Sequence, residues 1–172
     1  MFANDAYAHY GVNALIRHAP HALFQRLIQE NILPAVHTLI SHKFAITVLH
    51  SVYSSKWCSA HQRQLLIMAI YKDNMTVMST WTNFPDLYEV IRANQSIQKR
   101  LLTQLFDLCD KLVSQKDAIG FPFVQRLLYI YLRCGVQAEM AELCDTIRPH
   151  LPNLILLSVE GALLTSVVFA LS

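Results

Sequence analysis

The sequence is poor in residues that break helices. Its 172 residues include only four glycines and six prolines, whereas an all-β fold needs many closely spaced turns. Charged residues make up 15% and apolar residues 53%, a balance that excludes intrinsic disorder and predicts an unusually apolar surface. These scarcities predict one all-α domain, which is long enough to bury a sizeable core.

Cysteine is also scarce, and its spacing excludes the common zinc-ligand patterns. Cys58, Cys109, Cys134 and Cys144 include no Cys-x-x-Cys pair and no pairing with histidine at zinc-finger spacing. We expect four buried, reduced thiols, as is typical of an intracellular protein. The N-terminus lacks a basic segment followed by an apolar run, so no signal peptide is predicted.

Motifs for catalysis and cofactor binding are absent from the sequence. It contains no glycine-rich phosphate loop, no Gly-x-Ser-x-Gly and no His-Glu-x-x-His. Eight histidines raise the alternative of a metal site, but Pro20 separates His18 from His21. His37 and His42 lie across an expected helix boundary. We therefore expect no enzyme, no catalytic residue, no metal ligand, no cofactor and no small-molecule substrate.

The longest apolar stretch, residues 154–172, contains a single charged residue, Glu160. A carboxylate near the middle of a membrane span costs about 3 kcal/mol. Gly161, its neighbour, is compatible with a turn. We therefore favour two short buried helices over a membrane span and expect no membrane partner.

The sequence does contain an apolar segment, residues 41–50, that recurs along the chain. Tyr10, Gly11 and Val12 place an aromatic, a small and a β-branched residue in the same order as Phe44-Ala45-Ile46, which lies 34 residues further on. A second pair of similar segments, 123–128 and 160–164, has an offset of 38 residues. Self-similarity at a period in the thirties predicts a helical solenoid.

Prolines and capping residues divide the chain into helices. Pro20 and Pro34 each stand where a helix can begin, and Ser96 is a candidate N-cap. Gly135 lies where a left-handed C-cap residue would end a helix. We expect helices over 6–18, 21–31, 34–41, 61–71, 76–80, 85–93, 96–115, 124–134, 143–148, 154–159 and from 161 onward. Between the repeats we expect buried side chains at Leu15, Phe44, Leu49, Phe123 and Leu128.

A family resemblance rests on the same segments. His42-Lys43-Phe44-Ala45 and the apolar residues after it resemble the second helix of a Pumilio (PUF) repeat. Glu160-Gly161-Ala162 resembles the terminal-repeat variant of the atypical nucleolar Puf-A-like branch, and segments 61–66, 86–91 and 123–127 are similar in order and spacing to its later repeats. The resemblance implies a right-handed α-solenoid of divergent three-helix Pumilio-like repeats over 1–172. This would be a piece of a longer solenoid, with well-matched repeats near 10–43, 44–80 and 123–160, a degenerate repeat near 81–122 and a partial repeat over 161–172.

The resemblance also implies candidate RNA contacts. PUF repeats contact bases through two or three side chains of the second helix, at the first, second and fifth positions after its small residue. The residues at these positions here are Val12, Asn13, Ile16, Ile46, Thr47, His50, Gln125, Arg126, Tyr129, Leu163, Leu164 and Val167. Half of them are apolar and have no side-chain donor or acceptor for a base. The sequence departs from the family's base code, which favours binding to RNA phosphates with little sequence preference. The residues named as RNA contacts are Asn13, Arg17, Lys43, Thr47, His50, Gln125, Arg126 and Tyr129, and further candidate phosphate ligands are Lys56, Arg63, Lys99, Arg100 and Arg133.

The resemblance implies a cellular role as well. Its branch points to pre-rRNA and proteins of the pre-ribosomal particle as partners, and to pre-rRNA processing and large ribosomal subunit assembly in the nucleolus. Composition and periodicity alone predict only a helical-repeat binding module. The alternative is a protein-binding scaffold without direct RNA contact, favoured by the apolar residues at base-contact positions and a net charge of only +2. The same two alternatives apply to Arg126, which either contacts RNA or forms a hydrogen bond with an acidic neighbour such as Glu142.

Overall fold

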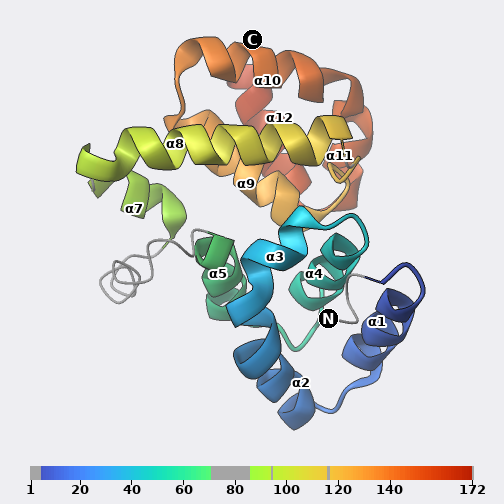
Figure 1. Cartoon of the computed structure of the whole chain (residues 1–172). Helices are drawn as coiled ribbons and strands as arrows, with labels where there is room; N and C mark the ends of the chain where they lie inside the picture. The colour runs from blue at the N-terminus through green and yellow to red at the C-terminus, as the bar shows by residue number, and fades with distance from the viewer. Residues whose placement is uncertain (1–4, 71–85, 94, 116, 172) are drawn as a thin grey trace. The chain divides into compact units, whose positions relative to one another are not determined.

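Helices and turns make up the described part of the chain, residues 5–70, 86–93, 95–115 and 117–171, and no strand occurs in these ranges (Figure 1). The predicted all-α class is therefore confirmed for these residues in the computed structural model. The chain divides into two compact units, Met1–Asn83 (unit 1) and Phe84–Ser172 (unit 2). Each unit is described by itself. The handedness and the repeat boundaries of a solenoid stay predictions.

Unit 1 is built around helix α4. Its elements are α1 (Ala8–His18), α2 (His21–Leu27), a π turn (Ile28–Ile32), a 3-10 turn (Leu33–Ala35), α3 (Val36–Ser41), α4 (Ala45–Tyr53) and α5 (Ala60–Met68). α4 packs against both α1 and α3. The core of unit 1 includes Phe24, Leu39 and Val48, which are fully buried.

The helix after Pro20 continues through Pro34. Proline has no N–H, and its ring crowds the carbonyl one turn earlier. The backbone accommodates this by widening into the π turn Ile28–Ile32 and then tightening into the 3-10 turn Leu33–Ala35. The expected interruption between 21–31 and 34–41 is therefore a change of helical pitch within one continuous helical run.

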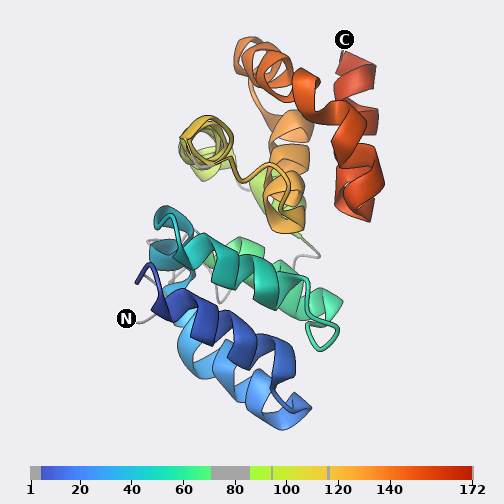
Figure 2. The same ribbon diagram turned by 90° about the vertical axis from the view of Figure 1, so that its right-hand side faces the viewer.

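α1 and α4 pack at the predicted 34-residue offset. Asn13 Nδ2 donates a hydrogen bond to Thr47 Oγ1, 34 residues further on, at 3.0 Å. One turn earlier on both helices, the rings of His9 and Phe44 stack with centroids 5.3 Å apart. The contacts advance together, so the two helices run side by side in the same direction (Figures 1 and 2). Stacked repeats require this packing of equivalent helices on each other.

Unit 2 is built around helix α9. Its elements are α7 (Leu87–Ala93), α8 (Gln95–Asp110), a π turn (Lys111–Gln115), α9 (Pro122–Cys134), α10 (Gln137–Ile147), a 3-10 turn (Arg148–His150), α11 (Leu151–Leu157) and α12 (Val159–Leu171). α9 packs on α7, α8 and α12. Most of its surface is apolar, and Val124, Leu127 and Tyr131 are fully buried, which explains its central place.

A serine and a glycine form the junction between α11 and α12. Ser158 ends α11 in an extended conformation, and its hydroxyl caps α12 by accepting the Gly161 N–H at 2.8 Å. Glycine is required at position 161, because a Cβ there would lie 2.1 Å from the Leu154 carbonyl oxygen. α12 therefore begins before Gly161, whereas the sequence pattern placed its start at this residue.

Several expectations about burial and caps need correction. Leu49, Phe123 and Leu128 are buried as predicted, but Leu15 is 46% exposed because it lies on the outer side of α1, and Phe44 is half-buried. Ser96 lies within α8, which includes Gln95, so it is not the N-cap. The helix expected over 76–80 lies outside the described residues.

Gly135 does not adopt the left-handed conformation expected of it. Its φ of −75° and ψ of −179° are extended. Glycine is needed there for space, since a Cβ would lie 2.7 Å from the ring of Tyr131. That ring is held by a hydrogen bond from its hydroxyl to Glu139 on α10, so Gly135 allows α10 to turn back over α9.

The apolar C-terminal stretch forms two helices, as expected, but they are not fully buried. Leu151 and Leu154 are buried, whereas Leu156 is 85% exposed and Phe169 is 70% exposed. None of the described helices combines the length and the hydropathy that a membrane crossing needs.

All four cysteines are free thiols. Cys58, Cys109 and Cys144 are buried, as expected, and Cys134 is half-buried. Burial raises the pKa of Cys58 to about 11 and that of Cys134 to about 12. These thiols therefore stay protonated at neutral pH and are poor nucleophiles.

Candidate nucleic-acid interface

Asn13 and Thr47, two of the residues named as RNA contacts, bind each other. Asn13 is only 9% exposed; it donates to the Thr47 hydroxyl, which in turn donates to the Phe44 carbonyl at 2.7 Å. The Asn13 Oδ1 atom is buried and has no hydrogen-bond partner in the described part of the chain. The pair therefore fixes α1 against α4 and presents little polar surface to a base.

Arg17 and His50, two further named residues, come together at the C-terminal ends of α1 and α4. They line a pocket of about 330 Å³, and its other lining residues are Ser51, Ser54, Ser55, Lys56 and Trp57. No carboxylate lines this pocket, so Arg17 and Lys56 give it two permanent positive charges beside hydroxyl groups. We refer to it below as the Arg17 pocket.

Hydrogen bonds hold the loop that follows α4 and forms one wall of the Arg17 pocket. The Ser54 N–H donates to the His50 carbonyl at 3.0 Å, and the Cys58 N–H donates to the Ser55 carbonyl at 3.1 Å. From α2, the Gln25 side chain donates to the Trp57 carbonyl at 3.2 Å. The loop is thus fixed at both ends by hydrogen bonds within the protein.

The Trp57 ring contacts the side chains of Lys56 and His21. Lys56 Nζ is 4.8 Å from the centre of its ring, and the ring of His21 on α2 lies 5.2 Å away, tilted by 55°. A cation over an exposed indole contributes about 0.5–1 kcal/mol. This contact is weak enough for a phosphate to draw Lys56 away from the ring.

The charge of the Arg17 pocket comes from Arg17 and Lys56 rather than from His50. Burial, and to a smaller extent the positive charge of Arg17, lower the pKa of His50, which leaves the imidazole neutral at pH 7. Arg17 also has a structural role, since a cation at a helix C-terminus stabilises the helix by about 0.3–1 kcal/mol. That role does not explain Lys56 and Trp57, which lie in the loop beyond α4.

The other lysines and arginines that the structure describes in unit 1 do not line this pocket. Lys43 is exposed in the turn between α3 and α4. Arg63 donates its Nε–H to the Tyr53 carbonyl at 2.9 Å and lies over the Tyr53 ring, so it anchors α5 to α4. The structure therefore keeps Lys43 as a possible phosphate contact and gives Arg63 a structural role.

In unit 2, Gln125 is an interior residue. It is 0% exposed, its Nε2 donates to the Ile119 carbonyl at 2.9 Å, and its Oε1 accepts from the Ser158 hydroxyl at 2.5 Å. The amide therefore ties α9 to the start of α12. This burial corrects the expectation that Gln125 contacts a base.

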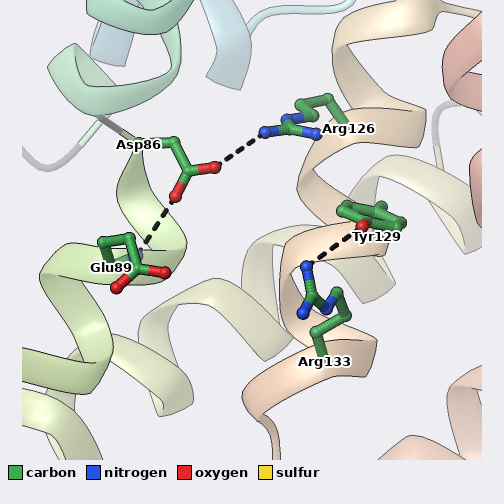
Figure 3. A network of polar contacts seen from close by, with 5 residues as sticks. All are labelled: Asp86, Glu89, Arg126, Tyr129 and Arg133. Atoms are coloured by element: carbon green, nitrogen blue, oxygen red, sulfur yellow. Dashed lines mark hydrogen bonds and ion pairs between the residues drawn. The ribbon is translucent and has the colours of Figure 1, made fainter. Parts of the chain in front are cut away.

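Arg126 is paired with an acid, but the acid is Asp86 and not Glu142. Its Nη2 lies 2.9 Å from Asp86 Oδ2, while Asp86 Oδ1 accepts the N–H of Glu89 at 3.1 Å (Figure 3). Asp86 thus caps the first turn of α7 and joins it to α9. Both side chains are less than one-third exposed, so the pair is a structural contact within unit 2.

Tyr129 belongs to the same cluster on α9. Arg133 donates to its hydroxyl at 3.1 Å (Figure 3), and the guanidinium of Arg126 lies 5.2 Å from its ring centre. Arg133 also lies 4.3 Å from the ring centre of Tyr88 on α7. The alternating arginines and tyrosines pack α7 against α9, which accounts for Arg126 and Tyr129 without RNA.

Sequence reasoning missed Trp57 as a site residue and Asp86 as the partner of Arg126. Trp57 directly follows Lys56, and single-strand-binding proteins combine positive charge with aromatic rings on which bases stack, so the pair could have been noticed in the sequence. No signal identified Asp86, because it lies 40 residues before Arg126.

Comparison with known proteins adds no further constraint. No family model, no curated protein and no solved structure matches the chain. Among the described residues, no group of three or more histidine, cysteine, aspartate or glutamate side chains is arranged to hold a metal ion.

Proposed function

We propose that the protein is a helical-repeat RNA-binding protein that contacts the phosphate backbone with little preference for sequence. The observation that carries this proposal is the Arg17 pocket, where two cations, Arg17 and Lys56, adjoin Trp57 and no carboxylate intervenes. Cations neutralise phosphates whatever the sequence. An aromatic ring likewise stacks on any base.

The low sequence preference follows from the positions that contact bases in PUF repeats. Ile46 and Leu164 are apolar and buried, and Gln125 is buried with both ends of its amide engaged. Discriminating one base from another requires exposed donors or acceptors aimed at its edge. These positions offer few of them, so the backbone supplies most of the affinity.

The cellular role we propose is pre-rRNA processing and assembly of the large ribosomal subunit in the nucleolus, with pre-ribosomal proteins as further partners. Its support is the resemblance to the Puf-A-like branch. The packing of α1 on α4 at a 34-residue offset agrees with the repeat on which that resemblance rests. Crosslinking the protein to RNA in cells tests this role: pre-rRNA should exceed mRNA among the recovered sequences, and the opposite ratio would contradict it.

A binding assay in solution tests the biochemical proposal. We expect similar affinities for several unrelated single-stranded RNAs, with a logarithmic salt slope of about −0.7 for each phosphate neutralised. Arg17→Gln should flatten this slope. Arg26→Gln is the matched control, because Arg26 is an exposed arginine on α2 that pairs with Glu30, one turn away, and does not line the pocket. A strong preference for one short motif would contradict the proposal.

A second candidate function is that of a protein-binding scaffold without direct RNA contact. It is favoured by the exposed apolar side chains of α11 and α12, which include Leu156, Leu157, Val159 and Phe169. Apolar surface of this kind marks many protein interfaces. If this candidate holds, Leu156→Glu should abolish partner binding while leaving helicity intact, and RNA crosslinking should recover no specific RNA.

A further inference from the structure

The strongest unassigned feature of the chain is the combination of charge and hydroxyl groups in the Arg17 pocket. A phosphodiester within a strand carries one negative charge, whereas a terminal phosphate monoester carries about −1.5 to −2 at pH 7. Arg17 and Lys56 together supply two positive charges, with no lining carboxylate to offset them. The pocket's permanent charge therefore matches a phosphate monoester better than a diester.

We propose that the Arg17 pocket binds the phosphorylated end of a single-stranded RNA. Arg17 and Lys56 would pair with the terminal phosphate, and the Ser54 and Ser55 hydroxyls would donate to its remaining oxygens. This inference rests on the proposed RNA binding and narrows it to one chemical group. It applies to a 5′-phosphate or a 3′-phosphate, which share this chemistry.

Trp57 provides the place for the adjoining base. Lys56 now lies over the Trp57 ring, and such a contact at an exposed site is weaker than the stacking of a base on an aromatic side chain. When Lys56 turns to a phosphate, the ring face it leaves accepts the base. The loop is already held by Gln25 and by Cys58, so little further ordering is needed on binding.

The helix termini at this pocket make both cations necessary. α1 and α4 direct their C-terminal ends, which carry partial negative charge, toward the pocket. A single cation beside them would leave too little positive charge for a dianion. Removing either Arg17 or Lys56 should therefore remove most of the preference for a phosphorylated end.

The experiment uses the full chain with Trp81→Phe, which leaves Trp57 as its only tryptophan. One oligoribonucleotide sequence is titrated in three forms, with a 5′-phosphate, with a 3′-phosphate and with hydroxyls at both ends, and both Trp57 fluorescence and affinity are recorded. We expect one phosphorylated form to bind about tenfold tighter than the hydroxyl form, because charge-assisted hydrogen bonds to one phosphate contribute about that much affinity. The same form should change Trp57 emission. Arg17→Gln and Lys56→Gln should abolish this preference, while Arg26→Gln should keep it.

The outcomes separate this inference from the proposed function. Equal affinity for the three forms, with a steep salt dependence, would overturn the inference and leave RNA binding in place. A phosphate preference that survives Arg17→Gln would also overturn it. If adenosine 5′-monophosphate changes Trp57 emission and Arg17→Gln removes the change, but no oligoribonucleotide binds, the pocket takes a phosphate monoester and the proposed RNA binding fails. Circular dichroism of each variant checks that its helices are intact.

Discussion

The two units of this protein use similar residues in opposite ways. Unit 1 contains six lysines and arginines and three acidic residues, whereas unit 2 contains eight lysines and arginines and nine acidic residues. Seven of the eight histidines lie in unit 1. In unit 1, Arg17 has no carboxylate partner among the described residues and lines a pocket. In unit 2, Arg126 is held by Asp86. Being an arginine on a repeat helix therefore does not make a residue an RNA contact; its partners decide.

Polar residues at two of the base-contact positions, one in each unit, show the same contrast. Thr47 in unit 1 remains partly exposed and binds Asn13 across the α1–α4 contact. Gln125 in unit 2 is fully buried and joins three segments of chain. Substitutions in the two units should accordingly affect stability to different extents, and the predictions below are ordered by the size of that effect.

The largest difference is expected between two helical glycines. Gly161→Ala places a Cβ 2.1 Å from the Leu154 carbonyl oxygen, and the backbone must shift, so we expect a loss of about 3 kcal/mol in the free energy of unfolding. Gly11→Ala meets nothing within 4 Å and should stabilise α1 by about 0.5–1 kcal/mol. Urea unfolding of both variants measures these changes; similar stabilities for the two would contradict the close approach of α11 to α12.

A smaller loss is expected on replacing Gln125. Gln125→Leu keeps the volume but leaves the Ile119 carbonyl and the Ser158 hydroxyl without their partner, which should cost about 2 kcal/mol. Its matched substitution in unit 1, Thr47→Val, removes one hydroxyl from a partly exposed site and should cost about 1 kcal/mol or less. RNA affinity should not change with Gln125→Leu at temperatures where the variant is folded. A loss of affinity without a loss of stability would restore Gln125 as an RNA contact.

Arg126→Ala should destabilise the protein by about 1 kcal/mol, because it breaks a partly exposed ion pair that joins α7 to α9. Arg133→Ala tests the neighbouring arginine, which is exposed and should matter less. Thermal unfolding of the two variants under identical conditions compares them. An Arg126→Ala protein as stable as the parent would show that the Asp86 pair contributes nothing.

The smallest effect concerns pH. The pKa of His50 is lowered in the folded protein, so below about pH 6.5 the unfolded chain binds more protons at this residue than the folded chain does. Acidification from pH 7 to pH 5 therefore reduces stability, and His50→Gln should make that reduction smaller. Unfolding free energies of parent and variant at both pH values measure the difference, and a steeper loss in the variant would contradict the direction of the pKa shift.

Much of the helical architecture was predictable from the sequence, because few breakers and a 3.6-residue apolar period leave little choice. The 34-residue offset predicted a helical repeat, and the Asn13–Thr47 contact between α1 and α4 has that spacing. The exposure of Leu15 was not predictable, since α1 has apolar residues on more than one side and the pattern does not say which side meets a neighbour. The helix continues through Pro34 because of a π turn, and the sequence contains no signal for such a turn.

The candidate site was predictable only in part. Arg17 and His50 were both named as RNA contacts, and the structure brings them to one pocket. Arg17 and His50 come together because α1 and α4 pack in parallel. The sequence does not reveal this packing. Arg126 and Tyr129 were named on the same grounds, yet tertiary partners distant in the sequence engage them. Which basic residues stay available is thus set by packing.

We propose that the RNA contacts lie in the Arg17 pocket and not on the Arg126 cluster. The most direct test measures the salt slope of binding to one single-stranded RNA for the parent, Arg17→Gln and Arg126→Gln, with thermal unfolding of each. The account predicts that Arg17→Gln flattens the slope by about 0.7 and leaves the unfolding temperature unchanged, while Arg126→Gln lowers the unfolding temperature and keeps the slope. A flattened slope with Arg126→Gln and an unchanged slope with Arg17→Gln would contradict it.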